Sequence, residues 1–209
     1  MADVLTHYVA SFLLLRRIFN LKTSLLIALV ALLPDIDIVF RIHRWFTHSI
    51  VVLGIAVSCL TLLLVLSKRY RKYILHLGAA ALVYLLHIAI DLFTAPTSVL
   101  WPLVSESYHL KILVQGSIAR DEAIAIYTIT KISISPSDFV PRDRVEGPLA
   151  TDLGIILALA TLTLELSDFM AKVIKNRSRG FKYSKISDSN NTNNSNREKV
   201  LQIYQDQRT

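Results

Sequence analysis

The sequence predicts an all-α integral membrane helical bundle of about four to five helices, with a small β-rich extramembrane insertion and a disordered C-terminal tail. Hydrophobic residues make up 53% of the chain, and the mean hydropathy is +0.46. Both values are high for a soluble domain. The apolar residues also gather in long segments, and one long polar segment separates the last two of these. Segments of this kind are typical of membrane-embedded helices joined by loops.

The net charge of +7 lies mainly at the C-terminal end, because Lys172 to Thr209 holds nine Lys/Arg and three Asp/Glu. A basic tail beside an apolar body favours an anionic membrane surface as partner. No helix-turn-helix, zinc-finger or RNA-binding signature accompanies it, so no nucleic acid is expected. We therefore divide the chain into a membrane-embedded domain, 1–175, and a basic Ser/Asn-rich tail, 176–209.

The apolar segments predict helices at 4–19, 23–40, 48–66, 74–93 and 150–168. Pro34-Asp35 breaks the second segment, and its first part is too short to cross a bilayer, which takes about 20 residues. The third segment is the clearest transmembrane candidate, with Thr47 as its expected N-cap.

The polar segment 95–149 is predicted to be an extramembrane insertion that contains a β-hairpin or small sheet. Leu110–Gln115 and Ala123–Ser135 are rich in Ile and Thr, and the second partly alternates between apolar and polar residues. The tail from Asn176 is rich in Ser and Asn and is predicted to be disordered, with a short helix near 198–207.

The positive charges predict the orientation in the membrane. Arg16, Arg17, Lys22, the basic cluster 68–72 and the tail all fall at one end of an alternating path through the bilayer. Positive residues in short loops favour the cytoplasm. We therefore expect a multi-pass protein of the cell (inner or plasma) membrane, with a cytoplasmic tail that carries no glycans.

The opposite, extracytoplasmic end collects side chains that bind metals. They are His7, Asp35, Asp37, His43, His48, His87 and Asp91. Carboxylate oxygens and imidazole nitrogens are ligands for Zn²⁺, Mn²⁺ and Fe²⁺. His87 and Asp91 are spaced i, i+4, which places them on one helix face. The sequence therefore predicts a site for one or two divalent ions, with zinc expected and manganese or iron as alternatives.

Each of these residues also has an ordinary explanation. Asp35 and Asp37 could cap a helix and a turn, His43 and His48 could be interfacial histidines, and a buried His–Asp hydrogen bond is a common structural motif. Ionisable groups beside membrane segments are costly, however, and are usually functional. Their gathering at one end favours a single site.

The same residues occur in five sequence blocks: T-H at 6–7, L-L-P-D-I-D at 32–37, H-R-W-F-T-H-S at 43–49, H-I-A-I-D-L-F-T at 87–94 and L-W-P at 100–102. In these blocks the chain, over about 1–122 and the final span, resembles the YdjM-type family, described as inner-membrane-associated, metal-dependent hydrolases. That family is in turn distantly similar to zinc-dependent phospholipase C and P1-type nucleases.

The resemblance implies that the metal ligands are His7, Asp35, His48, His87 and Asp91. Asp37 and His43 would either bind the ion as well or lie next to the residues that do. A later H-x-x-x-E of the zinc phospholipases is missing, since Leu113 lies four residues after His109. One or two ions are therefore expected rather than three. Glu122 is a candidate for a missing carboxylate, and a solvated loop charge is its ordinary explanation.

This chemistry suits phosphoester hydrolysis on a lipid or lipid-linked substrate, because a bound divalent ion activates water and polarises a phosphoryl oxygen. Asp35 or Asp37 would position the water or act as general base. Arg44 would neutralise charge on the phosphate. Four further side chains form either a slot for a lipid chain or an aromatic belt: Trp45, Phe46, Trp101 and Pro102.

The alternative is a non-enzymatic membrane protein that uses a structural metal or a His/Asp hydrogen-bond cluster. Transport of ions is a weaker interpretation, since the apolar segments 50–66 and 153–164 offer few polar residues. A membrane scaffold that acts through its basic tail is a third. A catalytic ion keeps one coordination position open for water, whereas protein ligands close a structural site, and this difference separates the first two hypotheses.

Overall fold

The computed structural model describes residues 3–42, 44–117, 125–144 and 147–175. The chain divides into two compact units, Met1–Leu159 and Ala160–Thr209. In the described residues it is mostly helical with one two-stranded sheet, as the sequence predicts. The predicted tail, its short helix, His43 and Glu122 lie outside the described residues.

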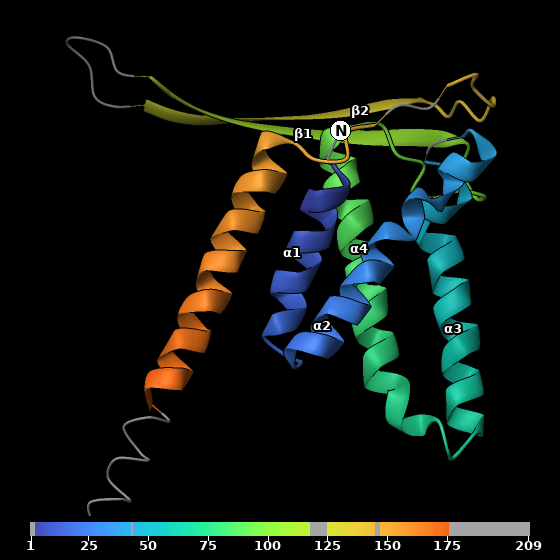
Figure 1. Cartoon of the computed structure of the whole chain (residues 1–209). Coiled ribbons are helices and arrows are strands. Elements are labelled where there is room, and N and C mark those ends of the chain that lie inside the picture. The colour runs from blue at the N-terminus through green and yellow to red at the C-terminus, as the bar shows by residue number, and fades with distance from the viewer. Residues whose placement is uncertain (1–2, 43, 118–124, 145–146, 176–209) are drawn as a thin grey trace, which may run out of the picture. The chain divides into compact units, whose positions relative to one another are not determined.

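Five α-helices form most of the described structure (Figure 1): α1 (Val4–Arg16), α2 (Leu21–Ala28), α3 (Ile50–Leu66), α4 (Ile74–Thr94) and the helix Asp152–Lys175. Short 3-10 helices continue or precede them: η1 (Leu29–Leu32), η2 (Pro34–Phe40), η3 (Phe46–His48) and η4 (Arg71–Tyr73). The break predicted at Pro34-Asp35 is therefore confirmed. Proline lacks the N–H that a continuous helix needs, and η2 starts at this residue.

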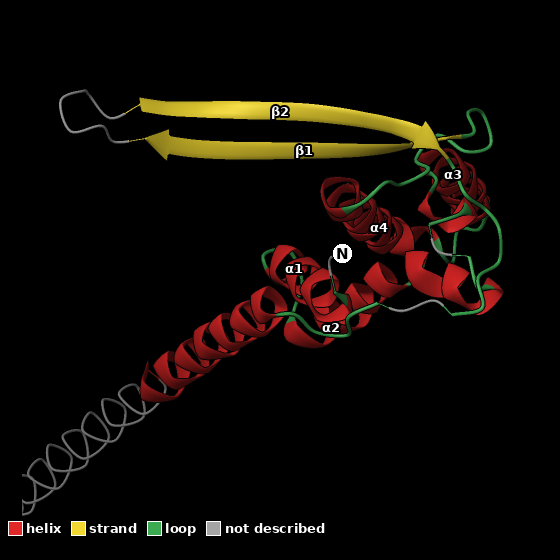
Figure 2. Cartoon of the chain, turned by 90° about the horizontal axis from the view of Figure 1, so that it is seen from above, coloured by secondary structure: helices red, strands yellow, loops and turns green. Residues whose placement is uncertain are grey.

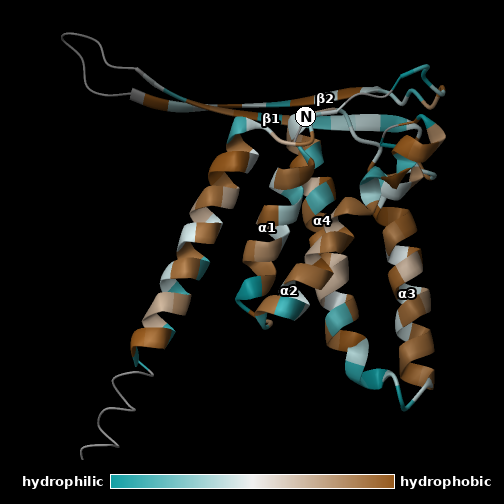
Figure 3. Cartoon of the chain, viewed as in Figure 1, coloured by the Kyte–Doolittle hydropathy of each residue, from teal (hydrophilic) through white to brown (hydrophobic). Residues whose placement is uncertain are grey.

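Among the described residues, two helices are long and apolar enough to cross a membrane: Arg71–Thr94 and Asp152–Lys175. Leu21–Leu32 and Pro34–Phe40 meet at an angle of 44° and give a third candidate if they count as one broken span. Figure 3 shows the apolar residues that run along α3 and α4 between their polar ends.

The third predicted segment differs from expectation at its start. Ser49, and not Thr47, is the N-cap of α3, because its hydroxyl accepts hydrogen bonds from the backbone N–H groups of Val51 and Val52. Thr47 instead donates to the Pro34 carbonyl at 2.6 Å. At 17 residues, α3 is shorter than the two candidate spans and is not one of them, so the segment predicted as the clearest transmembrane candidate forms a helix that is too short to count as a span.

A small core joins α1, the α2–η1 segment and α4. It consists of Phe12, Leu15, Ala28, Ala31, Ala79 and Val83. Alanine at three of these positions lets the helix backbones approach closely, as in membrane helix packing. The close packing fixes α1 and the second segment against α4, whose far end carries His87 and Asp91.

The polar insertion contains the predicted β-hairpin, made of β1 (Glu106–Ser117) and β2 (Ala125–Pro136). The strands pair antiparallel from Glu106 opposite Pro136 to Ser117 opposite Ala125. At the base of the hairpin, Thr97 and Tyr108 exchange two backbone hydrogen bonds of 2.9 Å. Figure 2 shows the hairpin from above, passing beside the end of α4 and extending beyond it.

One face of the hairpin carries more apolar side chains than the other. Side chains alternate between its faces, so cross-strand partners share a face. The register gathers on one face Tyr108, Leu110, Ile112, Val114, Ile126, Ile132 and Ile134. The opposite face is mixed, because it pairs Lys111 with Lys131 and Leu113 with Ile129. The apolar face contacts α4 near Leu92 at the base.

Asp3 joins the start of the chain to the last helix. Its carboxylate caps α1 by accepting from the backbone N–H and the hydroxyl of Thr6, each at 2.7 Å, and it also accepts from the Thr151 hydroxyl. Burial opposes ionisation of Asp3, but the hydrogen bonds from Thr151 and Thr6 outweigh it and lower the pKa of this carboxyl. Gly154 lies directly against this group.

Gly154→Ala should destabilise the protein. A Cβ at this position would lie 2.6 Å from Oδ1 of Asp3 and 2.8 Å from Oγ1 of Thr6, so the capping hydrogen bonds must shift or break. We expect a loss of about 1–3 kcal/mol, measured as a lower melting temperature in detergent. Gly54→Ala is the matched control, because a Cβ at Gly54 meets no atom within 4 Å. Alanine there should be neutral or stabilising, and equal shifts for the two variants would contradict the proposed contact.

Candidate metal centre

One hydrogen bond braces the loop between α2 and α3, and a second ties this loop to α4. Thr47 donates to the Pro34 carbonyl, and the Tyr84 hydroxyl donates to the Thr47 carbonyl at 2.5 Å. Tyr84 lies on α4 one turn before His87. These bonds bring η2 and η3 to the end of α4 that carries His87 and Asp91.

Four of the predicted ligands meet at this point. Asp35, His48, His87 and Asp91 each offer one ligand atom, and these atoms all lie within 4.8 Å of one another. His48, His87 and Asp91 are buried, whereas the Asp35 side chain is 20% exposed. We name these four residues the His/Asp cluster. It combines residues of η2, η3 and α4.

The spacing within the cluster resembles that of ligands around one metal ion. His48 Nε2 lies 3.4 Å from both His87 Nε2 and Asp91 Oδ2. His87 Nε2 lies 3.6 Å from Asp35 Oδ1 and 3.9 Å from Asp91 Oδ2, and the His48–Asp35 separation is 3.8 Å. Two ligands at tetrahedral positions about 2.0–2.2 Å from zinc are roughly 3.3–3.6 Å apart.

These separations also bear on the hydrogen-bond alternative. Direct hydrogen bonds between nitrogen and oxygen have lengths of about 2.7–3.2 Å, and the contacts among the four ligand atoms are longer. The cluster could therefore hold a divalent ion, and its donor set of two imidazoles and two carboxylates suits one.

Asp37 stands behind His48 and fixes its orientation. Nδ1 of His48 donates to Asp37 Oδ2 at 3.2 Å, and the backbone N–H of Trp45 donates to the same oxygen at 2.7 Å. With its proton on Nδ1, His48 directs the lone pair of Nε2 into the cluster. Asp37 is fully buried, and Oδ1 has no hydrogen-bond partner among the described residues.

The carboxylates around His48 favour positive charge. Burial opposes protonation of the His48 imidazole, but the nearby carboxylates of Asp37 and Asp91 outweigh burial and raise its pKa. Groups that favour an imidazolium favour a bound cation in the same way.

His7 extends the cluster from α1. Its ring stacks on that of His87 with 3.8 Å between centroids, and its Nε2 lies 3.4 Å from Asp91 Oδ1. Asp91 therefore faces His7 through Oδ1 and the other ligands through Oδ2. A carboxylate placed in this way can serve one ion or bridge two.

Arg44 also contacts Asp91. Its Nε donates to Asp91 Oδ2 at 2.7 Å, and the side chain is 9% exposed. The residue has a φ of 62°, in the left-handed region, and its carbonyl accepts a hydrogen bond of 2.6 Å from the Ser98 hydroxyl. The hydrogen bond from Ser98 helps to hold this uncommon backbone conformation.

The structure places the predicted site residues as follows. Asp35, His48, His87 and Asp91 form the cluster, while His7, Asp37 and Arg44 touch it, and His43 lies outside the described residues. Three of the side chains predicted to line a slot lie near one another. The ring centroid of Trp45 is 5.1 Å from that of Phe46 and 6.1 Å from that of Trp101.

Sequence reasoning missed Tyr84 and Ser98. Tyr84 precedes His87 by three residues, which puts both on one face of α4, and this spacing could have drawn attention to it. Ser98 follows α4 in an irregular segment, and no local pattern marks it.

A family model described as YdjM inner membrane protein matches residues 1–166. The predicted family is therefore confirmed over most of the chain. No curated protein and no solved structure matches significantly. The distant similarity to zinc-dependent phospholipase C and P1-type nucleases stays a prediction.

Removal of either histidine of the cluster should abolish metal binding. We expect purified wild-type protein to carry about one divalent ion per chain or more, and His48→Ala and His87→Ala to lose it, because each removes a ligand. His76→Ala, on α4 but outside the cluster, should retain the metal. Elemental analysis of the detergent-purified proteins measures this.

A milder variant refines the test. Asp37→Asn should weaken metal affinity about 10–100-fold without abolishing binding, because it removes the carboxylate that orients His48. Wild-type protein that remains without metal after incubation with Zn²⁺, Mn²⁺ or Fe²⁺ would refute the metal centre.

Proposed function

This chain belongs to the YdjM family of inner membrane proteins, and from that premise we propose that it is a membrane-bound metal-dependent hydrolase of phosphoester bonds in lipid or lipid-linked substrates. The observation that carries the proposal is the His/Asp cluster, in which the ligand atoms of two imidazoles and two carboxylates all lie within 4.8 Å of one another. We propose Asp35, His48, His87 and Asp91 as ligands, with His7 beside them.

The choice of metal follows from the donors. Imidazole and carboxylate suit zinc, with manganese and iron as alternatives. His7 lies near Oδ1 of Asp91, the oxygen that faces away from the other ligands, so these two residues could bind a second ion. A divalent ion supplies a water of lowered pKa and polarises a phosphoryl oxygen.

Three residues of the chain would serve the reaction in different ways. Asp35 is the most exposed member of the cluster, so we assign it the role of holding the attacking water and accepting its proton. Arg44 would stabilise negative charge on the phosphoryl group through N–H groups that Asp91 does not use. Asp37 is buried and already accepts from His48 and Trp45, so we propose that it positions His48 rather than acting as the base.

The substrate proposal depends on where the cluster lies along α4. His87 and Asp91 fall near one end of a candidate span, and Arg71 and Lys72 fall at its other end. If the basic end faces the cytoplasm, as positive loops favour, the cluster lies at the outer surface, at the level of lipid head groups. We propose this multi-pass orientation, with the tail in the cytoplasm.

A structural metal is the second candidate. The observation in its favour is that four protein ligands are enough to close a tetrahedral shell. The partial exposure of Asp35 favours catalysis instead, since one exchangeable ligand leaves room for water.

Hydrolysis can be tested with metal-loaded protein in detergent micelles containing phosphatidic acid, phosphatidylglycerol or a polyprenyl diphosphate. We expect turnover of at least one of these phosphoesters, measured as released phosphate or head group. Arg44→Gln should retain the metal and lower kcat about 100-fold, because it removes charge that stabilises the transition state. His76→Ala is the control and should be unchanged.

Absence of turnover on all three classes, with metal bound at full occupancy, would favour the structural role. X-ray absorption at the metal edge would then show four protein ligands and no exchangeable oxygen.

A further inference from the structure

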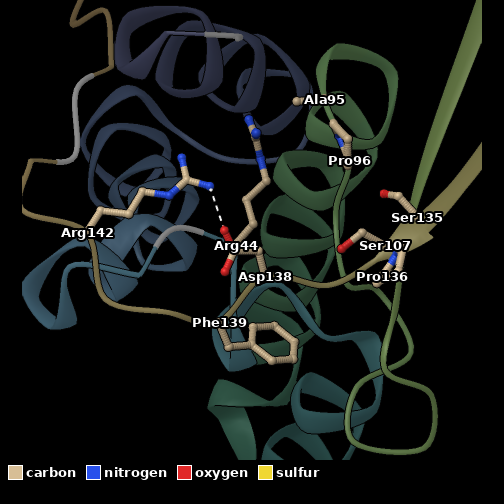
Figure 4. A pocket seen from close by; sticks show the side chains of 9 residues that line it. All are labelled: Arg44, Ala95, Pro96, Ser107, Ser135, Pro136, Asp138, Phe139 and Arg142. Atoms are coloured by element: carbon tan, nitrogen blue, oxygen red, sulfur yellow. Dashed lines mark hydrogen bonds and ion pairs between the residues drawn. The ribbon is translucent and has the colours of Figure 1, made fainter.

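A polar pocket adjoins the His/Asp cluster. It has a volume of about 380 Å³ and lies between the end of α4 and the base of the hairpin (Figure 4). Its polar lining comprises Arg44, Ser107, Ser135, Asp138 and Arg142. Because Arg44 also donates to Asp91 at 2.7 Å, its side chain links the pocket to the cluster.

Arg44 retains donor capacity for a ligand. Its Nε is used by Asp91, whereas Nη2 is buried and has no hydrogen-bond partner among the described residues. Buried charged donors are almost always paired. The side chain is more than nine-tenths buried and lines the pocket, so an acceptor bound there would satisfy it.

The segment after β2 supplies the opposite wall. The backbone N–H of Arg142 donates to the Arg41 carbonyl at 3.0 Å, which fixes this segment near Arg44. The Arg142 guanidinium pairs with Asp138 at 3.4 Å, and both side chains are more than half exposed. An exposed pair of this length is weak, so Arg142 can turn toward an anion.

Two serines line the hairpin side of the pocket. Ser107 and Ser135 are cross-strand partners at the base of β1 and β2. The Ser107 hydroxyl is already within 2.8 Å of the Ser137 hydroxyl. Each hydroxyl can both donate and accept, which suits a ligand that carries hydroxyl or amino groups.

We propose that this pocket binds the phosphate-bearing head group of the substrate, with Arg44 holding a phosphate oxygen and Arg142 holding the outer part. Guanidinium groups bind phosphate through paired N–H donors. Asp138 disfavours a second anion and accepts from a hydroxyl or ammonium group. The pocket therefore fits a phosphate joined to a small polar alcohol. As a statement about substrate recognition, the inference rests on the proposed function, whereas the binding itself does not.

Binding can be measured apart from hydrolysis. Full-length, metal-loaded protein in a neutral detergent is titrated with inorganic phosphate, with glycerol 3-phosphate and with phosphatidylglycerol in mixed micelles, followed by calorimetry. We expect Arg142→Ala to weaken binding about tenfold without a change in metal content, since Arg142 contacts no residue of the cluster. Asp138→Asn should strengthen binding of inorganic phosphate, because it removes a repelling charge. Arg69→Ala, in the basic connection before α4, should have no effect.

The three probes distinguish the source of the phosphate. An effect of Arg142→Ala on all three assigns the pocket to phosphate itself. An effect on the glycerol-containing probes alone assigns it to the head group, and either result supports the pocket. Affinities that change less than twofold in both Arg142→Ala and Asp138→Asn, with unchanged melting temperatures, would overturn it.

Turnover separates this inference from the proposed function. Protein that binds the probes through Arg142 but hydrolyses no phosphoester would keep the pocket and reject the hydrolase. Protein that hydrolyses a lipid phosphoester with the same KM in wild type and Arg142→Ala would keep the hydrolase and reject the pocket.

Discussion

The arrangement at the end of α4 depends on the burial of one carboxylate. Asp91 is 1% exposed and contacts His7, Arg44, His48 and His87. A buried charge is costly unless it is paired and hydrogen-bonded. These partners come from α1, the α2–α3 loop, η3 and α4, so satisfying Asp91 requires that these elements meet. The alanine-rich core between α1, η1 and α4 allows this by bringing the backbones close.

The features that could be predicted from the sequence are those that depend on residues close together in the chain. The prediction that His87 and Asp91 share one helix face is confirmed, because both lie on the uninterrupted helix α4. The predicted break at Pro34 is confirmed because proline restricts the backbone wherever it occurs. The alternating Ile and Thr of 123–135 predicted β2 for the same local reason. The separate prediction that seven residues gather at one end of the helical bundle came from charge and topology. In the structure, the ligand atoms of four of them lie within 4.8 Å of one another.

What the sequence missed depends on contacts between distant segments. Thr47 has the residue type of an N-cap, but the Pro34 carbonyl claims its hydroxyl, and Ser49 takes the cap. The sequence left open whether Asp37 binds the ion or lies beside the ligands, and its position behind His48 follows from the 3-10 geometry of η2, which no periodicity reveals. The approach of Arg142 to Arg44 depends on a hydrogen bond across a hundred residues.

The hairpin differs in stability along its length. At the base, the Thr97–Tyr108 bridge and the contact with α4 hold the strands, whereas Val114 and Ile126 toward the tip are 64% and 74% exposed. A two-stranded ribbon is marginally stable in water without such support. Its outer amide hydrogens should therefore exchange with solvent sooner than those at the base, through local opening that leaves the rest of the fold intact. Ser107 and Ser135 belong to the slowly exchanging end, so fraying of the tip does not disturb the geometry of the pocket.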